Sequence, residues 1–352
     1  MDRDIFVQEE ARKRIERDID ERIAVHKANI VRLATAQASA TALGVAVRNR
    51  PLILLAQGDS WFDYPLTGNG LPLVDTDVIA QLRRIGPMPP TILNLAHHGD
   101  AAVDEMSLPK QERMIAALRD PSNWINGKPD AILFSAGGND IAGDQFCIFL
   151  DFNDGRTPGL NADRFGKALG MVEACYLDLF ALRDRIAPGV PIFAHCYDFP
   201  IPNGAHPVCA GPWLKPSLDF CNWSTAQGTA IIREALIAFR DMLHRLAGTP
   251  SNLFHTVDTQ GTLSAADWAN ELHPFPAGFA KIAQLFSDAL SRHVRPADMV
   301  AALAASAEAP PTPPLASTAT SAKEPAKKRA TPRGKAAATK GDTSRTGRRR
   351  KA

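Results

Sequence analysis

Five short apolar runs alternate with longer segments of helical periodicity through the middle of the chain. The runs are Leu52–Ala56, Ile92–Ala96, Ala131–Ser135, Val190–His195 and Leu253–Val257. Each run is apolar on both faces, which is typical of strands in a parallel sheet that helices cover on both sides. The pattern therefore predicts an α/β fold, a three-layer α/β/α sandwich built on about five parallel strands.

Polar residues follow directly after the first three of these runs. They are Gly58-Asp59-Ser60, His97-His98-Gly99 and Gly137-Gly138-Asn139-Asp140. Because the carboxyl ends of parallel strands form the ligand-binding edge of an open sheet, we expect the three clusters to meet there. The irregular, aromatic-rich insertion Phe199–Trp223 follows the fourth run and leaves the same edge. It is either a lid or substrate wall, or a loop packed on its own aromatic side chains.

A long helical segment, residues 4 to 43, precedes the first run. Its apolar residues recur near helical spacing among charges, at Ile5, Ile15, Ile19, Ile23, Ile30 and Leu33. This stripe fits a helix docked on the main domain and also fits a short coiled-coil arm. We divide the chain into an N-terminal helical arm, residues 1–45, a main domain, residues 46–300, and a C-terminal tail, residues 305–352.

The C-terminal tail differs from the rest of the chain in composition and charge. It consists mainly of Ala, Pro, Thr, Lys and Arg without any aromatic residue, so it cannot bury enough apolar surface to offset the entropy of folding. From Ser321 onward it has 12 Lys and Arg against 2 Asp and Glu, which leaves 28 basic and 36 acidic residues elsewhere. We predict a disordered tail that either binds nucleic acid or another polyanion weakly and without sequence specificity, or only aids solubility.

The remaining composition is that of a globular protein, with 45% hydrophobic and 22% charged residues. The first residues, MDRDIFVQEEARKR, contain no apolar run for a signal peptide, and no stretch of about 18 apolar residues suits a membrane span. A cytoplasmic location is therefore expected. The five cysteines, Cys209 among them, are odd in number and lack CxxC spacing. They predict reduced thiols rather than a disulfide framework or a zinc site.

The polar clusters resemble the sequence blocks of SGNH (GDSL-like) hydrolases. Gly58-Asp59-Ser60-Trp61 resembles the first block, Gly99 matches the glycine of the second, and Gly137–Asp140 resembles the GxND block. His273, within Asn270-Glu271-Leu272-His273-Pro274, matches the histidine of the last block. Each block is weak alone, but the four occur in the family's order across roughly two thirds of the chain. The resemblance implies a serine esterase with the flavodoxin-like SGNH hydrolase fold.

The chemistry of ester hydrolysis accounts for these residue types. The resemblance makes Ser60 the nucleophile and His273 the base, because a serine hydroxyl needs a neighbouring group that accepts its proton. Fixed hydrogen-bond donors stabilise the negative charge of the tetrahedral intermediate. By resemblance these donors are the backbone N–H groups of Ser60 and Gly99 and the side-chain amide of Asn139. The implied reaction passes through an acyl-Ser60 intermediate and requires no cofactor.

The residue that orients His273 departs from the family pattern. The family usually has Asp three residues before the histidine, whereas this chain has Asn270. Losing that carboxylate from a serine protease triad costs about 10⁴ in rate. The orienting group is left open among Asn270, a nearby carboxylate from Asp267 or Glu271, and a backbone carbonyl. The alternative function is a weak or vestigial hydrolase that acts as a polyanion-binding or scaffold protein through its basic tail.

Other residues near the blocks are given structural roles. The adjacent His97 and His98 should point apart on an extended segment, so we expect no metal site. Asp59 and Asp140 should hydrogen-bond loop backbone rather than act as acids.

The aromatic residues Trp61, Phe62 and Tyr64 either line an acyl pocket or pack a helix that begins after the nucleophile. We expect a small-molecule or acyl-ester substrate. The residues do not distinguish an acyl chain, a lysophospholipid, a thioester and an acetylated sugar.

Overall fold

The computed structural model of the protein describes residues 2–44, 50–65, 76–205 and 211–294. The predicted tail and Cys209 lie outside the described residues, so what was predicted for them stays a prediction. The cysteines within the described ranges have free thiols; they are Cys147, Cys175, Cys196 and Cys221.

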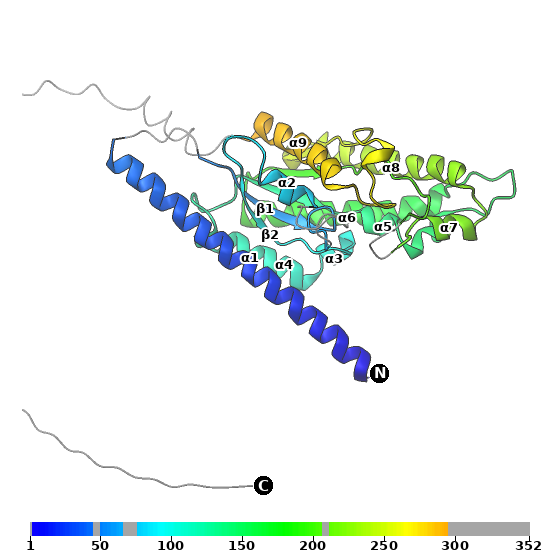
Figure 1. Ribbon diagram of the computed structural model, residues 1–352, viewed down its shortest axis with the longest axis horizontal. Helices are drawn as coiled ribbons and strands as arrows, with labels where there is room; N and C mark the ends of the chain where they lie inside the picture. Colours follow the sequence, from blue (N-terminus) through cyan, green and yellow to red (C-terminus); the bar gives the residue numbers. More distant parts are fainter. Residues whose placement is uncertain (1, 45–49, 66–75, 206–210, 295–352) are drawn as a thin grey trace, which may run out of the picture. The chain divides into compact units, whose positions relative to one another are not determined.

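A parallel sheet of five strands forms the centre of the described structure (Figure 1). The strands are β1 (Ile53–Gly58), β2 (Thr91–Asn94), β3 (Ala131–Ser135), β4 (Ile192–His195) and β5 (Phe254–Val257). Their order is β2-β1-β3-β4-β5, which is the flavodoxin-like order. Every residue of β1 and β3 is buried, because helices cover both faces of the sheet. The α/β sandwich predicted from the apolar runs is confirmed.

Helices cover the two faces of this sheet in two groups (Figure 1). On one face α2 (Val78–Leu82) packs against α9 (Pro276–His293). On the other face α6 (Ala162–Ile186) packs against α4 (Leu108–Arg119) and α8 (Thr225–Ala247). From β1 the chain passes to the edge strand β2. From there it returns past β1 and adds β3, β4 and β5 in turn on the other side. Because crossovers between parallel strands are right-handed, this reversal places α2 on the face opposite α4, α6 and α8.

Short helices follow the carboxyl ends of the strands; they are α3 (Ala102–Glu105), α5 (Gly138–Ile141), η3 (Asp144–Phe149), α7 (Lys215–Phe220) and η5 (Ala265–Asp267). Two others, η2 (Pro121–Asn123) and η4 (Pro250–Asn252), come before β3 and β5. Helix α7 lies within the insertion that the sequence predicts to be irregular. The insertion is therefore partly helical, and Pro at the second position of α7 suits a helix start.

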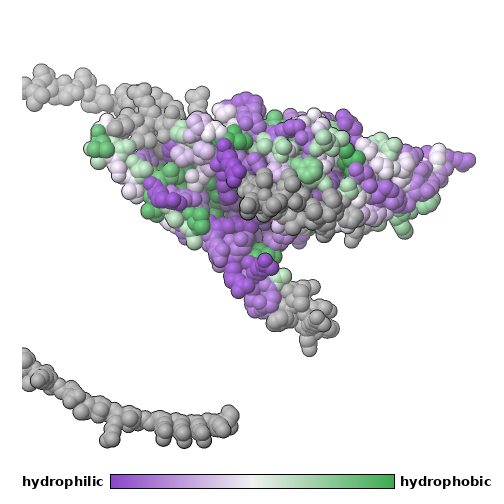
Figure 2. All heavy atoms as spheres, in the orientation of Figure 1, coloured by the Kyte–Doolittle hydropathy of each residue, from purple (hydrophilic) through white to green (hydrophobic). Residues whose placement is uncertain are grey.

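The N-terminal helix α1 (Asp2–Ala42) packs along the edge strand β2 and along η2. Ile19 and Ile30 enter the core with exposed fractions of 1% and 5%. His26 Nε2 donates to the Asn123 carbonyl at 2.9 Å. Among the coloured residues of Figure 2, those of α1 that project beyond the sheet are mostly hydrophilic. The predicted helix is confirmed, and it docks on the main domain, where it covers a sheet edge that would otherwise be open.

Ile19→Ala should lower the free energy of unfolding by about 2 to 5 kcal/mol, because it removes a buried branched side chain and leaves a cavity. Val31, which is 62% exposed on the same helix, provides the matched control. Val31→Ala should change the free energy of unfolding by less than about 0.5 kcal/mol. Urea unfolding followed by circular dichroism measures both variants. A small effect of Ile19→Ala, equal to that of the control, would contradict the docking of α1 on the core.

Candidate active site

The end of β1 presents Ser60 in a tight turn. Gly58 precedes it because β1 passes close to β3: a Cβ atom at Gly58 would lie 2.7 Å from the Ser135 Cβ. The Asp59 N–H donates to the Ser135 carbonyl at 3.0 Å. Asp59 Oδ1 accepts the Trp61 N–H at 3.0 Å, which confirms the backbone role predicted for this carboxylate. These bonds fix the turn that carries Ser60 at the carboxyl edge of the sheet.

Ser60 and His273 are in hydrogen-bond contact although 213 positions separate them in the chain. The Ser60 Oγ to His273 Nε2 distance is 2.7 Å, and both residues are buried. Burial and, to a smaller extent, the charge of nearby His98 lower the pKa of His273 to about 3. The His273 ring is therefore neutral near pH 7, so its Nε2 can accept a proton from the serine hydroxyl.

Asn270 lies behind the His273 ring. Asn270 Oδ1 is 3.2 Å from His273 Nδ1, and it also accepts the backbone N–H groups of Leu272 and His273, each at 2.9 Å. Because these backbone donors require an acceptor, the oxygen rather than the NH₂ group faces the ring. Nδ1 then carries the ring proton and Nε2 is left as the acceptor. The amide of Asn270 therefore selects the tautomer in which Nε2 faces Ser60 Oγ as an acceptor.

Two aromatic side chains pack against the His273 ring. Tyr64 follows the nucleophile turn, and its ring centroid is 4.6 Å from that of His273. Trp213, from the insertion, meets His273 edge-on at 5.5 Å. The Tyr64 hydroxyl also accepts the Asn270 Nδ2–H at 3.2 Å. Tyr64, which follows the Ser60 turn, therefore holds both His273 and Asn270, and Trp213 of the insertion packs on His273.

The two carboxylates near His273 in sequence have other partners. Asp267 accepts from both Lys281 Nζ, at 2.8 Å, and Ser264 Oγ, at 2.7 Å. Glu271 is fully buried and accepts four backbone N–H groups of the insertion at 2.7 to 3.1 Å; they belong to Gly204, Trp213, Leu214 and Lys215. Neither carboxylate is a hydrogen-bond partner of the His273 ring. Of the three candidate orienting residues, the structure brings only Asn270 to it.

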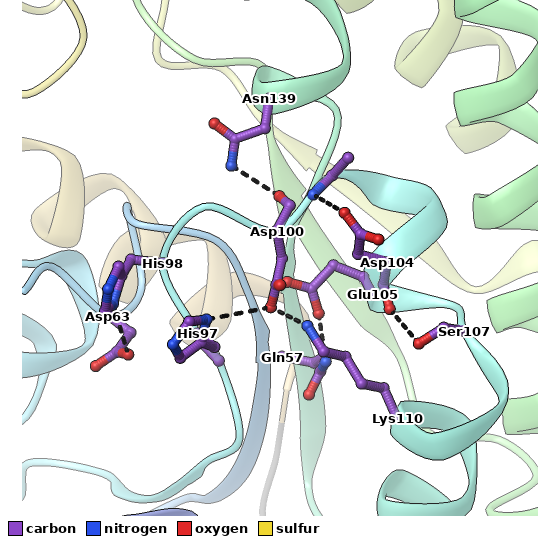
Figure 3. A network of polar contacts seen from close by, with 12 residues as sticks. Gln57, Asp63, His97, His98, Asp100, Asp104, Glu105, Ser107, Lys110 and Asn139 are labelled. Carbon is purple, nitrogen blue, oxygen red and sulfur yellow. Dashed lines mark hydrogen bonds and ion pairs between the residues drawn. The ribbon is translucent and has the colours of Figure 1, made fainter. Parts of the chain in front are cut away.

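The loops after β2 and β3 meet through Asn139 (Figure 3). Asn139 Nδ2 donates to the Asp100 carbonyl at 2.7 Å, and since an amide nitrogen carries two hydrogens, one is left for a ligand. Gly99 has φ +85°, a left-handed conformation that suits glycine. Within the described residues the backbone N–H groups of Ser60 and Gly99 have no hydrogen-bond partner. The three predicted donors therefore each keep an N–H able to bind a ligand oxygen.

Charged side chains hold the Gly99 loop on one side (Figure 3). The Asp100 carboxylate pairs with Lys110 and lies 3.9 Å from His97 Nδ1. The prediction that His97 and His98 point apart is wrong, because their rings stack with centroids 4.3 Å apart. The backbone turns at His98 and Gly99 instead of staying extended, which brings the two rings to the same side.

Arg22 of α1 supports the same loop from the other side. Arg22 Nη1 donates to the Ala96 carbonyl at 3.1 Å, and Arg22 Nη2 donates to Asp63 Oδ1 at 2.8 Å. Ala96 precedes the Gly99 loop, and Asp63 follows the nucleophile turn. A single guanidinium of the N-terminal helix therefore links the two segments that carry Ser60 and Gly99. The sequence gives no sign of this contact, because Arg22 is one of many charges on α1.

A buried chain of hydrogen bonds lies beneath Ser60. Ser135 Oγ donates to Asp59 Oδ1 at 2.7 Å and contacts His195 Nε2 at 2.8 Å, while the Tyr197 hydroxyl donates to Asp59 Oδ2 at 2.5 Å. Burial raises the pKa of Asp59 to about 6, although these donors act against the shift. Ser135 and His195 form a second serine–histidine pair, but both are fully buried. Through Asp59 this pair supports the turn that carries Ser60, and it is not exposed to a ligand.

Asp140, the last residue of the GxND block, has the backbone role predicted for it. Its Oδ2 accepts the Ala102 N–H at 2.7 Å, across the gap between the loops after β3 and β2. Of the aromatic residues after Ser60, Phe62 lies in the core and Tyr64 contacts His273. A turn, not a helix, begins after the nucleophile.

An apolar cavity opens beside Ser60 and His273. It encloses about 560 Å³, part of which is open solvent. Its lining also includes Asn139 and Trp61, so one of the candidate donors and the aromatic residue next to the nucleophile face the same space. The Ser60–His273 contact thus lies at the wall of an apolar cavity that opens to solvent.

Among the described residues no group of three or more His, Cys, Asp and Glu side chains is arranged to hold a metal ion. No helix within those residues is long and apolar enough to cross a membrane.

Several solved structures are similar to this chain. The lipase Lip_vut3 from a goat rumen metagenome is 14% identical, with a TM-score of 0.45 over 68% of this chain and 97% of that one. An extracellular lipase from Streptomyces rimosus is 17% identical, with a TM-score of 0.43 over 67% and 98%. A member of the lipolytic protein G-D-S-L family from Veillonella parvula is 14% identical, with a TM-score of 0.39 over 68% and 98%. No family model and no curated protein sequence matches the chain.

Glu271→Gln should loosen the insertion, because the substituted NH₂ group would face backbone N–H groups that need an acceptor. Each buried donor left without one costs about 1 to 3 kcal/mol, so hydrogen exchange at the amides of Trp213, Leu214 and Lys215 should be about tenfold faster or more. Asp267→Asn is the control, because Asp267 bonds to Lys281 instead, and it should leave these three amides unchanged. Unaltered exchange in Glu271→Gln would refute the anchoring role of Glu271.

Proposed function

We propose that this protein is a serine esterase that hydrolyses carboxylic esters through an acyl-Ser60 intermediate. The observation that carries the proposal is the 2.7 Å contact between Ser60 Oγ and His273 Nε2 at the wall of the cavity. A serine hydroxyl paired with a neutral, oriented imidazole is the arrangement that activates an oxygen nucleophile.

In the acylation half of the reaction, Ser60 Oγ attacks the ester carbonyl carbon and its proton passes to His273 Nε2. The negative charge on the former carbonyl oxygen is bound by the N–H groups of Ser60 and Gly99 and by the amide of Asn139. One such donor contributes about 3 to 4 kcal/mol to stabilising the transition state. The His273 imidazolium then gives its proton to the departing alkoxide, which leaves the acyl group on Ser60.

In the deacylation half, water attacks the acyl carbonyl carbon and gives a proton to His273 Nε2. The same donors hold the second oxyanion. His273 returns the proton to Ser60 Oγ as the carboxylic acid departs, so the enzyme is restored without a cofactor.

Asn270 gives this site a neutral orienting group. Its Oδ1 can accept the Nδ1–H of His273 in both the neutral and the charged state, as the Asn of Cys-His-Asn proteases does. An amide does not contribute the negative charge with which an Asp stabilises the imidazolium. The role of the amide is therefore to fix the tautomer and the ring position.

The alternative, a vestigial hydrolase that acts through its basic tail, stays a prediction, because the tail lies outside the described residues. The intact contact between Ser60 and His273 favours an enzyme.

Ser60→Ala and His273→Ala should each reduce the turnover of p-nitrophenyl butanoate by about 10⁴- to 10⁶-fold, because residues that act as one unit lose nearly all catalysis singly. Both variants should keep the circular dichroism spectrum of the wild type. Ser135→Ala, in the buried serine–histidine pair, is the matched control and should retain far more turnover than Ser60→Ala. An active Ser60→Ala beside an inactive Ser135→Ala would reverse the assignment of the nucleophile.

Asn270→Asp should move the acid limb of the pH profile of kcat/KM to higher pH. In the wild type the limb should lie below pH 6.5, because burial lowers the pKa of His273 and keeps the base unprotonated in mild acid. A carboxylate beside Nδ1 favours the imidazolium and so raises that pKa. Turnover near neutral pH should stay the same or rise. Initial rates between about pH 4 and pH 8 measure the limb. Coincident limbs for the two proteins would contradict the contact between residue 270 and the ring.

A further inference from the structure

We propose that the cavity beside Ser60 holds the acyl chain of the substrate, and that this chain is an uncharged aliphatic group longer than acetyl. The proposal rests on the esterase function proposed above and adds the substrate class and the residues that select it. Three points support it: the walls of the cavity are apolar, its lining has no Lys or Arg that could pair with an acidic ligand, and the alcohol leaves before the acid.

Apolar side chains from three segments form the walls. Helix α8 contributes Ile232, Ala235 and Leu236, whose exposed fractions are 4%, 2% and 6%. Ile141 of α5 and Phe146 of η3 add further apolar wall, and both are buried. Each methylene that leaves water for such a surface is stabilised enough to raise kcat/KM about fourfold. An acetyl group has no methylene with which to gain from these walls.

The insertion contributes to the cavity wall and is itself fixed by the loop that carries His273. Leu214, which is 2% exposed, contributes a further apolar wall. The Leu214 N–H donates to Glu271 Oε2 at 2.9 Å, two positions before His273. The short segment from Glu271 to His273 therefore positions both the Leu214 wall and His273. This keeps the cavity aligned with the Ser60–His273 contact.

The charged groups that line the cavity cannot bind an acidic acyl group. They are Asp59 and Asp198, apart from the base His273, and the lining includes no Lys or Arg. Asp198 is already satisfied by the backbone N–H groups of Phe199, Gly261 and Leu263, at 2.6 to 2.7 Å. A carboxylate or phosphate on the acyl chain would lose its hydration without gaining a counter-ion, which is costly in an apolar site.

The chemistry assigns the cavity to the acyl side of the ester rather than to the alcohol. After the first half of the reaction the acyl group stays bound to Ser60 while the alcohol leaves and water enters. An alcohol held by these apolar walls would have to leave them before water could attack the acyl carbonyl carbon, whereas the acyl group stays in place. The group that stays bound through both halves of the reaction is therefore the one that the apolar walls can hold throughout the cycle.

The test is the dependence of kcat/KM on chain length in two ester series. p-Nitrophenyl acetate, butanoate, hexanoate and octanoate vary the acyl chain with one leaving group, and ethyl, butyl and hexyl acetates vary the alcohol. For the wild type kcat/KM should rise about fourfold per added acyl methylene until the cavity is filled, and should stay flat across the alcohols. p-Nitrophenyl hemisuccinate, an acyl chain with a terminal carboxylate, should react at least tenfold more slowly than the butanoate.

Two wall variants test whether α8 sets the preference. Ala235→Phe fills the cavity and should reverse the order, so that acetate becomes a better substrate than octanoate. Ile232→Ala enlarges the cavity and should move the optimum to a longer chain. Ala230→Phe makes the same exchange as Ala235→Phe at an exposed position of α8, and should keep the wild-type order.

The outcomes separate this proposal from the esterase function. Wild-type activity on acetate without any rise along the acyl series would overturn the acyl-chain assignment and leave the esterase function standing. A rise along the alcohol series instead would place the alcohol in the cavity and also overturn it. Absence of hydrolysis of every ester would defeat the esterase function itself. If Ala235→Phe does not fold, an unchanged optimum in Ile232→Ala refutes the role of α8.

Discussion

The contact between Ser60 Oγ and His273 Nε2 is the interaction on which the rest of the site depends. It joins the end of the first strand to a loop that follows the last one, and the parallel direction of the strands makes this possible by placing all their carboxyl ends at one edge. The surrounding structure serves to hold these two groups. Asn270 fixes the ring tautomer, Tyr64 and Trp213 pack on the ring, and the bonds of Asp59 fix the turn that carries the serine.

Asn270 and Glu271, neighbours in the loop that carries His273, have different hydrogen-bond partners. The amide of Asn270 faces the His273 ring, whereas the carboxylate of Glu271 points away and accepts four backbone N–H groups of the insertion. A buried carboxylate is stable only with such donors, and here they come from the segment that walls the cavity. The loop therefore sets the base and the cavity wall together.

The fold was predictable because it follows from local patterns, and the pairing of Ser60 with His273 was implied by the resemblance to SGNH hydrolases. The apolar runs gave the parallel sheet, and the position of Ser60 directly after a strand placed it at the ligand-binding edge. The partners of Asp267, Glu271 and Arg22 were not predictable, because they depend on which loops the fold brings together. The stacking of His97 on His98 was missed for a related reason, since a turn at Gly99 cannot be read from spacing alone.

Labelling with a fluorophosphonate is the most direct test that Ser60 is an activated nucleophile. The probe reacts with a serine whose proton a neighbouring base accepts, and mass spectrometry of the digested protein then locates the adduct. We expect one label on the peptide that contains Ser60, and none after Ser60→Ala or after heat denaturation of the wild type. A native protein that stays unlabelled, or a label that persists in Ser60→Ala, would contradict the assignment of Ser60.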